Sequence, residues 1–401
     1  MAIVAVLVSN PCIGDARVIK MARAARVAGH EVHGFATSGA NALPYEVVGG
    51  INFHRLDWRP TDVLTAAGPM KWLKRLNRRL GMLVAKRMTP FVKYRLFARV
   101  FAERIAALAP DLVHAHDLIC LPAAHAAAQA TGARLVYDAH ELETHRNPPL
   151  PFFQKRWVGH VEAKFARRAD AVITVGALVC RELSAHIRRR DVNVIYNSPP
   201  LDACPRTIRG DLRLDADVPL ILYVGKVTAG RGVGEILNLL PKMPGVMFAT
   251  VGPCDAQSRV QLKAQANRLG MAMRFRILPP VPFEQVVSYV AGADLGVISV
   301  EPVTLSYRYC MPNKLFELSF ANVPIISNKL DEIEGYLGEL GNGEIAEFDN
   351  KAALAYTMYR MLREKGRYVM GPDALRRMHE TYSWESQASK LVAIYDAVLA
   401  K

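Results

Sequence analysis

The residues with the most to offer chemically gather where predicted strands end. In the stretch "GKVTAGRGVGE", Gly225–Glu235, glycines surround Lys226 and Arg231 just before a predicted helix. Two cations beside the free backbone amides of a helix start can bind an anion such as a diphosphate. A glycine-rich turn with two solvated cations accounts for the same residues equally well. The spacing is not that of the phosphate-binding loop G-x4-GK[ST].

A second possible anion site lies in "MPNKLFELSFANVPIISN", Met311–Asn328. Pro312 suits the first turn of a helix, whose free amides would point toward a phosphate. Those amides belong to Lys314, Leu315 and Phe316. Glu317 follows one turn later and could accept two hydrogen bonds from a diol such as ribose. It could instead stabilise the helix dipole or pair with Lys314, three residues earlier.

Two further polar stretches follow predicted strands in the first half of the chain. In "SNPCIGDARV", Gly14 would let the backbone approach a ligand and Asp15 would cap the next helix, although a simple capped turn explains both. The stretches "VHAHD" and "VYDAHELE" supply candidate metal ligands at His114, His116, Asp117, His140, Glu141 and Glu143. Their spacing lacks the paired pattern of known zinc sites. We therefore predict no metal site, but a polar cluster in which one histidine faces a ligand.

The hydrophobic pattern predicts the elements that hold these residues. Short apolar runs alternate with helical patterns, which indicates parallel sheets covered on both faces. The predicted strands are 3–9, 31–37, 51–57, 111–116, 134–139, 171–175 and 193–197, then 220–224, 246–251, 274–278, 295–300, 323–327 and 344–348. A helix is predicted over 16–28, ended by Gly29. The Pro-rich stretch 197–211 separates the two series. We predict two Rossmann-like, doubly wound domains facing a cleft that lies beyond the carboxyl ends of the strands.

Taken in order, the four stretches resemble the family-4 type of retaining glycosyltransferases with the GT-B fold. The resemblance covers nearly the whole chain. Its most specific parts are "ARVIKMARAARVAGHEV", "DLVHAHD", "LVYDAHELE", "ADAVITV" with "VIYNSPP", and "MPNKLFELSFANVPIIS". It implies an acceptor-binding domain over 1–198, on which the C-terminal helix 384–401 packs, and a donor-binding domain over 199–383.

The resemblance also implies roles for single residues. In the family, the residue matching Glu317 holds the nucleotide ribose, and the cations matching Lys226 and Arg231 hold the donor diphosphate. The glycine loop matching Gly14 lies against donor and acceptor, and the histidine matching His140 sits by the donor sugar. Further expected donor-binding residues are His116, Gly225, Tyr309, Pro312, Asn313, Lys314 and Leu315. Asp15 is a candidate for orienting the acceptor.

Two departures from the family pattern concern the donor. The family usually has Arg before Lys in the glycine loop, whereas here Lys226 precedes Arg231, which moves the bidentate guanidinium to the second position. The Glu-x7-Glu motif would place its first acid at Tyr309. In the family that acid contacts the transferred sugar, so the identity of the sugar is open at this position.

The implied reaction moves a sugar from a UDP- or GDP-linked donor to a hydroxyl of a glycan or lipid-linked acceptor, with retention. The pathway expected from the resemblance is cell-surface polysaccharide biosynthesis, for capsule, exopolysaccharide or lipopolysaccharide. The family type needs no metal or other cofactor, because basic side chains and helix N-termini stabilise the leaving diphosphate. No carboxylate nucleophile or general base is evident, so we expect front-face attack with the leaving phosphate as base.

Composition and charge bear on location and partners. Six cysteines without a CxxC pair indicate a reducing compartment, and the N-terminus has no basic stretch typical of a signal peptide. The net charge of +14 implies an anionic partner. From Val63 to Ala102 there is no Asp or Glu, while cations and apolar residues including Trp72 alternate.

This pattern over 71–99 is typical of a helix at an anionic membrane surface. We therefore expect a cytoplasmic protein, peripheral at the inner face of the cytoplasmic membrane. A solvated helical face would have the same pattern. No recognised motif supports nucleic-acid binding.

Three rival functions are weighed against glycosyl transfer. A nucleotide-sugar epimerase of the same fold would need acids for proton abstraction, to which the sequence does not point. A GT-B-like binding protein without catalysis is suggested only by Tyr309. A nicotinamide-dependent oxidoreductase is disfavoured because the chain lacks G-x-G-x-x-G.

Overall fold

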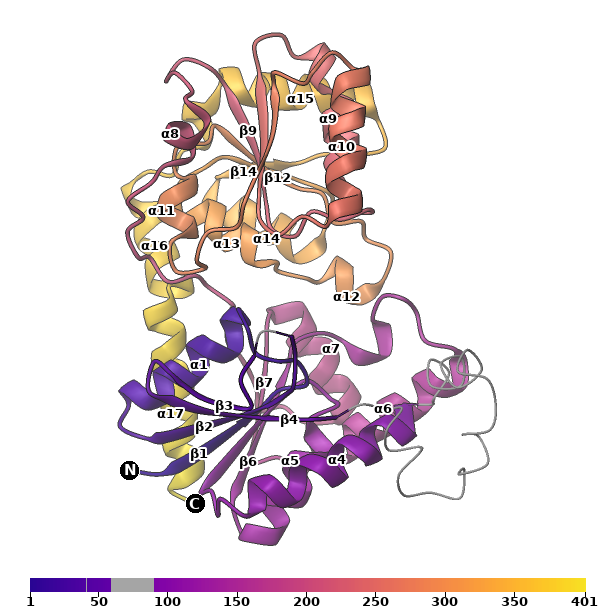
Figure 1. The fold of residues 1–401 in the computed structure, drawn as a ribbon, viewed down its shortest axis with the longest axis vertical. Coiled ribbons are helices and arrows are strands. Elements are labelled where there is room, and N and C mark those ends of the chain that lie inside the picture. The colour runs from indigo at the N-terminus through magenta and orange to yellow at the C-terminus, as the bar shows by residue number, and fades with distance from the viewer. Residues whose placement is uncertain (41, 59–89) are drawn as a thin grey trace. The chain divides into compact units, whose positions relative to one another are not determined.

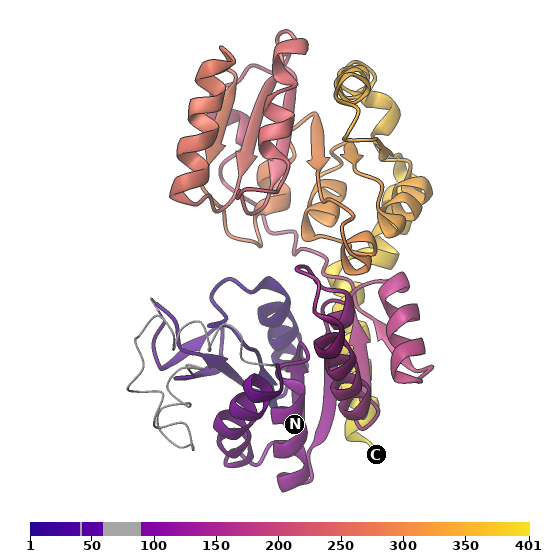
Figure 2. The same ribbon diagram turned by 90° about the vertical axis from the view of Figure 1, so that its right-hand side faces the viewer.

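The chain folds into two compact units, Met1–Ile195 with Ala388–Lys401, and Tyr196–Gln387 (Figure 1). The computed structural model describes residues 1–40, 42–58 and 90–401. Each unit is built around one mainly parallel sheet, and Figure 2 shows helices on both faces of each sheet. The predicted fold class, two Rossmann-like parallel-sheet domains, is confirmed.

The first unit contains an eight-stranded sheet in the order β3-β4-β2-β1-β5-β6-β7-β8. Its strands are β1 (Ile3–Leu7), β2 (Glu31–Thr37), β3 (Tyr45–Val48), β4 (Ile51–Leu56), β5 (Leu112–His116), β6 (Arg134–Ala139), β7 (Ala171–Thr174) and β8 (Val192–Val194). The central strands are buried along their length, as their continuous apolar runs require. The sheet order reverses at β1, which lies between β2 and β5, so the loop after β1 is at a switch point where ligands bind in such folds.

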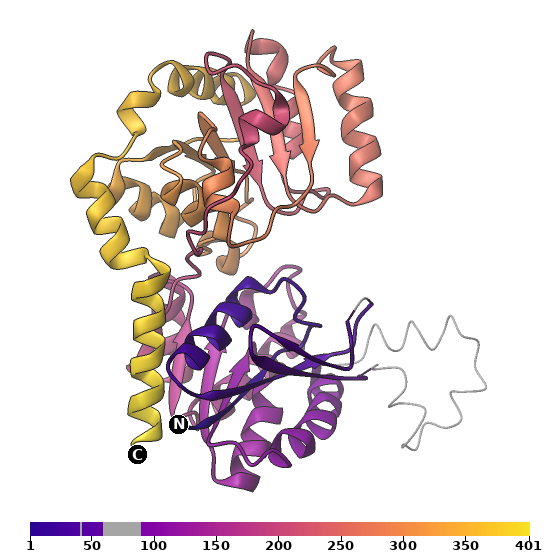
Figure 3. The same cartoon turned by 60° about the vertical axis from the view of Figure 1, so that its left-hand side comes forward.

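Helices and one unpredicted strand complete the first unit. The helices are α1 (Ala16–Val27), α4 (Pro90–Ala106), α5 (Leu121–Thr131), η2 (Glu143–His145), α6 (Phe152–Ala166) and α7 (Ala177–Ile187). The antiparallel strand β3 was not predicted, although the Gly49–Gly50 turn that joins it to β4 is a hairpin signal. The C-terminal helix α17 (Trp384–Leu399) runs along this unit, as Figure 3 shows, and its Tyr395 hydroxyl lies 2.6 Å from Nδ1 of His114.

The second unit contains a six-stranded parallel sheet in the order β11-β10-β9-β12-β13-β14. Its strands are β9 (Leu220–Val224), β10 (Met247–Val251), β11 (Phe275–Leu278), β12 (Leu295–Ile298), β13 (Ile325–Ser327) and β14 (Gly343–Ile345). Its helices are α8 (Ile208–Leu212), α9 (Val233–Leu237), η3 (Leu240–Lys242), α10 (Ala256–Arg268), α11 (Val286–Val290), α12 (Leu305–Arg308), α13 (Asn313–Phe320), α14 (Asp331–Leu340), α15 (Lys351–Arg363), η4 (Lys365–Tyr368) and α16 (Pro372–Tyr382). Here the order reverses at β9, so the glycine-rich loop after β9 is again at a switch point.

Side chains alternate between two cores on the faces of the second sheet. Leu222 of β9 packs with apolar residues of α11, α13 and α14 on one face. Ile221 and Tyr223 face the other side, toward α9, α10 and α15. The predicted stretch 311–328 therefore forms a core helix and strand whose N-terminal end meets the end of β9.

Most of the basic segment 71–99 lies outside the described residues. Its last part, residues 90–99, belongs to α4. In the described part of the chain, no helix combines the length and the apolar character that crossing a membrane requires.

Candidate functional site

The loop after β1 ends in a capped helix. Gly14 has a φ of 71°, and Asp15 directly precedes α1, where its carboxylate accepts a hydrogen bond from the Val18 amide. The amide nitrogen of the Asn10 side chain donates to Asp15 at 2.8 Å. The predicted capping role of Asp15 is confirmed, and it leaves the carboxylate only partly exposed.

A buried ion pair lies next to this loop at the carboxyl ends of the first unit's strands. Arg17 of α1 donates to both carboxylate oxygens of Asp138 in β6, at 2.8 Å each, and to the Ile195 carbonyl at 2.8 Å. Both side chains are almost completely buried. Burial by itself would raise the pKa of Asp138, but Arg17 and His140 hold that pKa well below its usual range.

His140, just after β6, is the exposed member of this cluster. Its Nε2 lies 3.3 Å from Asp138, its Nδ1 lies 3.4 Å from Asp117, and its side chain is 22% exposed. Burial opposes the charged form, yet the carboxylates of Asp117 and Asp138 raise the pKa of His140 to about 9. At neutral pH the cluster therefore presents an imidazolium to the outside.

The two histidines of β5, His114 and His116, are buried and do not have the ligand-binding position that the sequence predicted for His116. His116 was predicted to bind the donor, but it has no exposed surface, and its Nδ1 lies 3.1 Å from Nε2 of His140 and 3.3 Å from Asp138. Burial lowers the pKa of both His116 and His114, which keeps the two rings neutral. His116 is thus placed to position His140 rather than to touch a substrate. The reason is that both faces of a parallel strand are covered.

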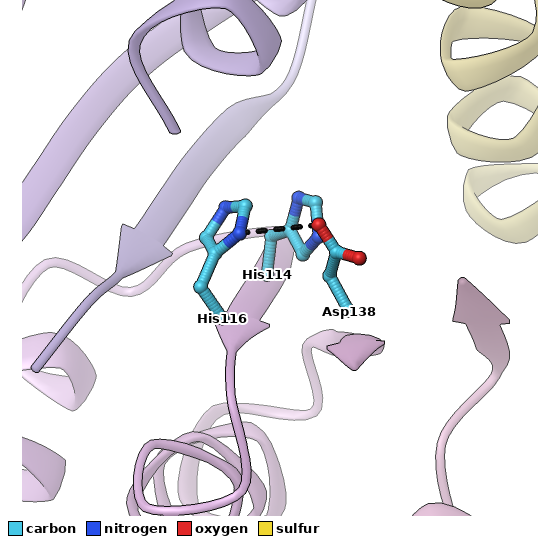
Figure 4. Close-up of side chains that lie close together, drawn as sticks. All are labelled: His114, His116 and Asp138. Carbon is cyan, nitrogen blue, oxygen red and sulfur yellow. Dashed lines mark ion pairs between the residues drawn. The ribbon is translucent and has the colours of Figure 1, made fainter. Parts of the chain in front are cut away.

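Three of these groups are close enough to hold a metal ion. The ligand atoms of His114, His116 and Asp138 lie within 4.8 Å of one another, and Figure 4 shows the His116–Asp138 contact beside His114. However, Arg17 already occupies both oxygens of Asp138, and a metal ion there would lie next to its guanidinium. We assign no metal to this cluster.

Two members of the cluster illustrate the limits of sequence reasoning. Asp138 stands inside the quoted motif "VYDAHELE" but was not predicted as a site residue, and Arg17 carries no local signal of its role.

Glu143, a candidate metal ligand from the sequence, is 6% exposed and pairs with Arg146 at 3.3 Å. Burial, with a further contribution from Asp117, raises the pKa of Glu143 to about 7.

The glycine-rich loop after β9 carries the two predicted cations of the second unit. The side chains of Lys226 and Arg231 are both exposed. The loop is anchored by the Ser299 hydroxyl, which donates to the Arg231 carbonyl at 2.6 Å. Gly232 has a φ of 76°, and a Cβ there would collide with the side chain of Ser299, so only glycine fits.

The start of α13 meets this loop. The ammonium of Lys314 lies 3.6 Å from the centre of the Tyr223 ring, and burial lowers the pKa of Lys314 to about 7. A pocket of about 200 Å³ is lined by Gly225, Asn313, Lys314 and Glu317. Apolar residues, among them Val281, Phe283 and Val286, also line it.

Three expectations for the stretch 309–317 need correction or detail. The Leu315 amide, expected to be free, donates to the Pro312 carbonyl at 2.9 Å, because the first turn of α13 is tight. Pro312 directly precedes the helix instead of lying in its first turn. Tyr309, directly after α12, is 8% exposed, and the Asn313 side chain accepts a hydrogen bond from Asn197 at 2.7 Å.

The structure thus gathers the predicted residues into two groups, each at the carboxyl ends of its unit's central strands. Gly14, Asp15, His116 and His140 lie in the first unit. The glycine-loop cations and the α13 residues lie in the second, where Lys314 and Glu317 line one pocket with Gly225.

Comparisons with known proteins bear on the family and on the fold of the chain. Residues 16–202 match the model of Glycosyltransferase Family 4. The D-inositol 3-phosphate glycosyltransferase of Xylanimonas cellulosilytica is 25% identical over 306 residues, which is 71% of each chain. The match to proteins of the same name from Mycobacterium tuberculosis spans 61% of their length.

Two solved structures share the fold over the whole chain. Sucrose-phosphate synthase from Thermosynechococcus elongatus has a TM-score of 0.73 at 17% identity and covers 100% of both chains. Anabaena HepE, solved in complex with UDP and glucose, has a TM-score of 0.70 at 15% identity, covering 99% of this chain and 100% of that one. The GT-B fold and the resemblance to family-4 glycosyltransferases are confirmed.

Proposed function

We propose that this chain, a glycosyltransferase of the family-4 type with the GT-B fold, transfers a sugar from a nucleoside diphosphate sugar to an acceptor hydroxyl with retention. The donor is UDP- or GDP-linked, and the acceptor is a glycan or a lipid-linked glycan of cell-surface polysaccharide biosynthesis. The observation that carries the proposal is the pocket of the second unit, where Gly225, Lys314 and Glu317 meet at the end of β9.

The lining of that pocket suits two parts of a nucleotide. Its apolar residues, such as Val281 and Phe283, offer a surface for a base, and the carboxylate of Glu317 can accept hydrogen bonds from ribose hydroxyls. Beyond the ribose, the exposed cations Lys226 and Arg231 are available to a diphosphate. In the described part of the chain neither cation has an ion-pair partner within 4.0 Å, so no internal carboxylate competes with a ligand for them.

The proposed mechanism depends on how the protein stabilises the negative charge that develops on the leaving diphosphate. As the bond to the anomeric carbon breaks, negative charge grows on the leaving diphosphate, and Lys226 and Arg231 stabilise it. We assign the His140 imidazolium to the donor sugar, where a fixed positive charge would be held by Asp117 and Asp138. The leaving phosphate takes the acceptor proton during front-face attack, and Asp15 stays available to orient the acceptor. Basic side chains take the part that a metal ion plays in other glycosyltransferases, so activity should survive a chelator.

The comparisons support the choice of donor. HepE is solved in complex with UDP and glucose, and the Xylanimonas relative is named for transfer to D-inositol 3-phosphate. Neither finding identifies the sugar, for which Tyr309 is the position to examine first.

A thermal-shift screen of UDP, GDP and their sugar conjugates tests the proposal, followed by measurement of nucleotide release with and without acceptor extracts. A nucleotide present at a concentration 100 times its Kd should stabilise the protein by about 2.7 kcal/mol. Release of nucleoside diphosphate with a new glycosidic bond supports transfer. Binding without turnover would favour the inactive binding protein, and isomerised donor without transfer would favour the epimerase.

We also propose that the first unit docks on an anionic membrane surface. On α4, Arg95 and Arg99 are exposed and Lys93 is partly exposed. At the start of α6, Phe152 and Phe153 are 72% and 82% exposed. Cations that attract anionic lipid and aromatic rings that insert into the headgroup layer are the two components of interfacial binding.

Vesicle flotation tests this docking. Wild-type protein should float with phosphatidylglycerol vesicles and not with phosphatidylcholine vesicles, and the Phe152→Ala/Phe153→Ala pair should lose most of the bound fraction. The matched control replaces two exposed apolar residues of the second unit, Val260→Ala with Tyr356→Ala. Binding that ignores lipid charge, or equal loss in the control, would exclude this surface.

A further inference from the structure

The Lys314 side chain is held in an unusual place for a lysine. It leaves the first turn of α13, and its ammonium lies over the Tyr223 ring at 3.6 Å from the ring centre. The Gly225 backbone flanks it, since a Cβ on Gly225 would lie 3.6 Å from Cε and 3.7 Å from Nζ of Lys314. The end of the side chain therefore lies between an aromatic ring and the glycine loop, although the residue as a whole is partly exposed.

The negative charge near the Lys314 amine does not offset the effect of burial, so the charged form of the amine is disfavoured. Burial lowers the pKa of Lys314 to about 7; Glu317 raises it, Arg231 lowers it, and Cys310 has a smaller raising effect. The Tyr223 hydroxyl donates to the Lys226 carbonyl at 3.1 Å, and burial raises its pKa, so it supplies no anion. Burial also raises the pKa of the Cys310 thiol to about 12. Among the described side chains that act on this amine, Glu317 therefore supplies the negative charge, and Arg231 opposes it.

A doubly charged ligand would change this balance. Lys314 lines the same pocket as Glu317 and Gly225, and it is close enough to Arg231 for that charge to lower its pKa. A diphosphate bound there would bring negative charge to a lysine that otherwise has a ring as its nearest partner. Its ammonium would then gain charge-assisted hydrogen bonds, which are stronger than the contact with the ring.

We propose that Lys314 is a diphosphate ligand that rests on the Tyr223 ring in the free protein and turns onto the diphosphate of the donor when the donor binds. This inference rests on the proposed function and names a residue of the same site. Above about pH 7 the Lys314 amine of the free protein is largely neutral, so binding converts it to an ammonium with a proton taken from the solvent. Above neutral pH, donor binding is therefore coupled to the uptake of one proton.

Isothermal titration calorimetry tests this coupling. Full-length protein is titrated with UDP and with GDP at about pH 8, in buffers that differ in ionisation enthalpy. The phosphates of these nucleotides are already fully ionised there, because the second phosphate pKa is about 6. For the nucleotide that binds, we expect uptake of about one proton per ligand, and an affinity that falls about tenfold per pH unit above about pH 7.

Three variants locate the effect. Lys314→Met should take up no proton and bind the nucleotide about 10- to 100-fold more weakly at neutral pH. Lys314→Arg keeps a permanent charge, so it should bind without proton uptake and with little pH dependence. Lys263→Met removes an exposed lysine of α10 and should behave as wild type.

The outcomes separate this inference from the proposed function. Tight nucleotide binding without proton uptake, or proton uptake that persists in Lys314→Met, overturns the role of Lys314 and leaves the proposed function standing. If neither nucleotide binds to wild-type protein, the proposed function fails and this inference fails with it.

Discussion

The polar clusters of the two units are organised in opposite ways. In the first unit, Arg17, Asp138 and His140 satisfy one another inside the protein, and only the outer part of His140 reaches solvent. In the second, Lys226 and Arg231 are exposed on a glycine-rich loop and have no ion-pair partner within 4.0 Å in the described part of the chain. One cluster holds a fixed charge in place, and the other keeps its charges available for a ligand.

This difference predicts different consequences of mutation. A buried, paired charge is tied to the stability of the fold, because removal of one partner leaves the other uncompensated. An exposed cation at a switch point adds little to stability, yet it can act strongly on a developing negative charge. Loss of the buried Arg17–Asp138 pair should therefore act mainly on stability, and loss of the exposed cations Lys226 and Arg231 mainly on catalysis.

The largest expected effect comes from Asp138→Asn. Loss of the carboxylate leaves the Arg17 guanidinium buried without its counter-ion, so the free energy of unfolding should fall by about 3–5 kcal/mol. Denaturant unfolding followed by circular dichroism measures this change. The control is Asp373→Asn, which breaks an exposed Arg376–Asp373 pair and should cost less than about 1 kcal/mol. Equal losses in the two variants would contradict the contrast.

Next in size is Arg231→Ala. Turnover of the donor should fall about 100-fold, which corresponds to about 3 kcal/mol of transition-state stabilisation, while the unfolding curve should hardly move. Glu317→Ala should instead weaken nucleotide binding. Steady-state kinetics measures both, with Arg268→Ala on the exposed face of α10 as the control. Unchanged turnover in Arg231→Ala would show that the glycine-rich loop is not part of the donor site.

A smaller effect separates the two glycine loops. Gly232→Ala combines a positive φ with a collision against Ser299, so we expect a loss of about 1–3 kcal/mol in the stability of the second unit. Gly14→Ala has a similar φ but open space around its Cβ, and the backbone penalty alone is about 1 kcal/mol. Thermal unfolding compares the two. A greater loss for Gly14→Ala would show that the Ser299 anchor does not restrict the loop.

The smallest effect is a shift in titration. Because the pKa of His140 is raised to about 9, its ion-pair stabilisation is complete below the ordinary value near 6.5 and is lost as pH rises through about 9. Asp117→Asn removes one of the two carboxylates and should lower that pKa by about 1 unit, since Asn tolerates the positive φ at this position. Histidine NMR titration reads the change. An unaltered titration would mean that Asp117 does not hold the imidazolium.

Much of the fold could be predicted because its signals are local. Continuous apolar runs indicated buried parallel strands, and the helix predicted over 16–28 is observed at Ala16–Val27. The same pattern failed for β3, whose exposed and partly polar residues show no buried run. It also could not tell whether His116 faces a ligand, because a parallel strand is covered on both sides.

The sequence by itself determined which residues stand at strand ends: the capped loop at Asp15, the glycine loop with its two cations, and the helix that carries Glu317. These depend on neighbours within a few residues, so spacing and turn chemistry are sufficient. Only the tertiary structure decided how charges are paired. Arg17 meets Asp138 across 121 positions, and His114 meets Tyr395 across 281. The enclosure of Lys314 against Tyr223 was decided in the same way, since contacts over such separations arise from packing and leave no periodic trace in the chain.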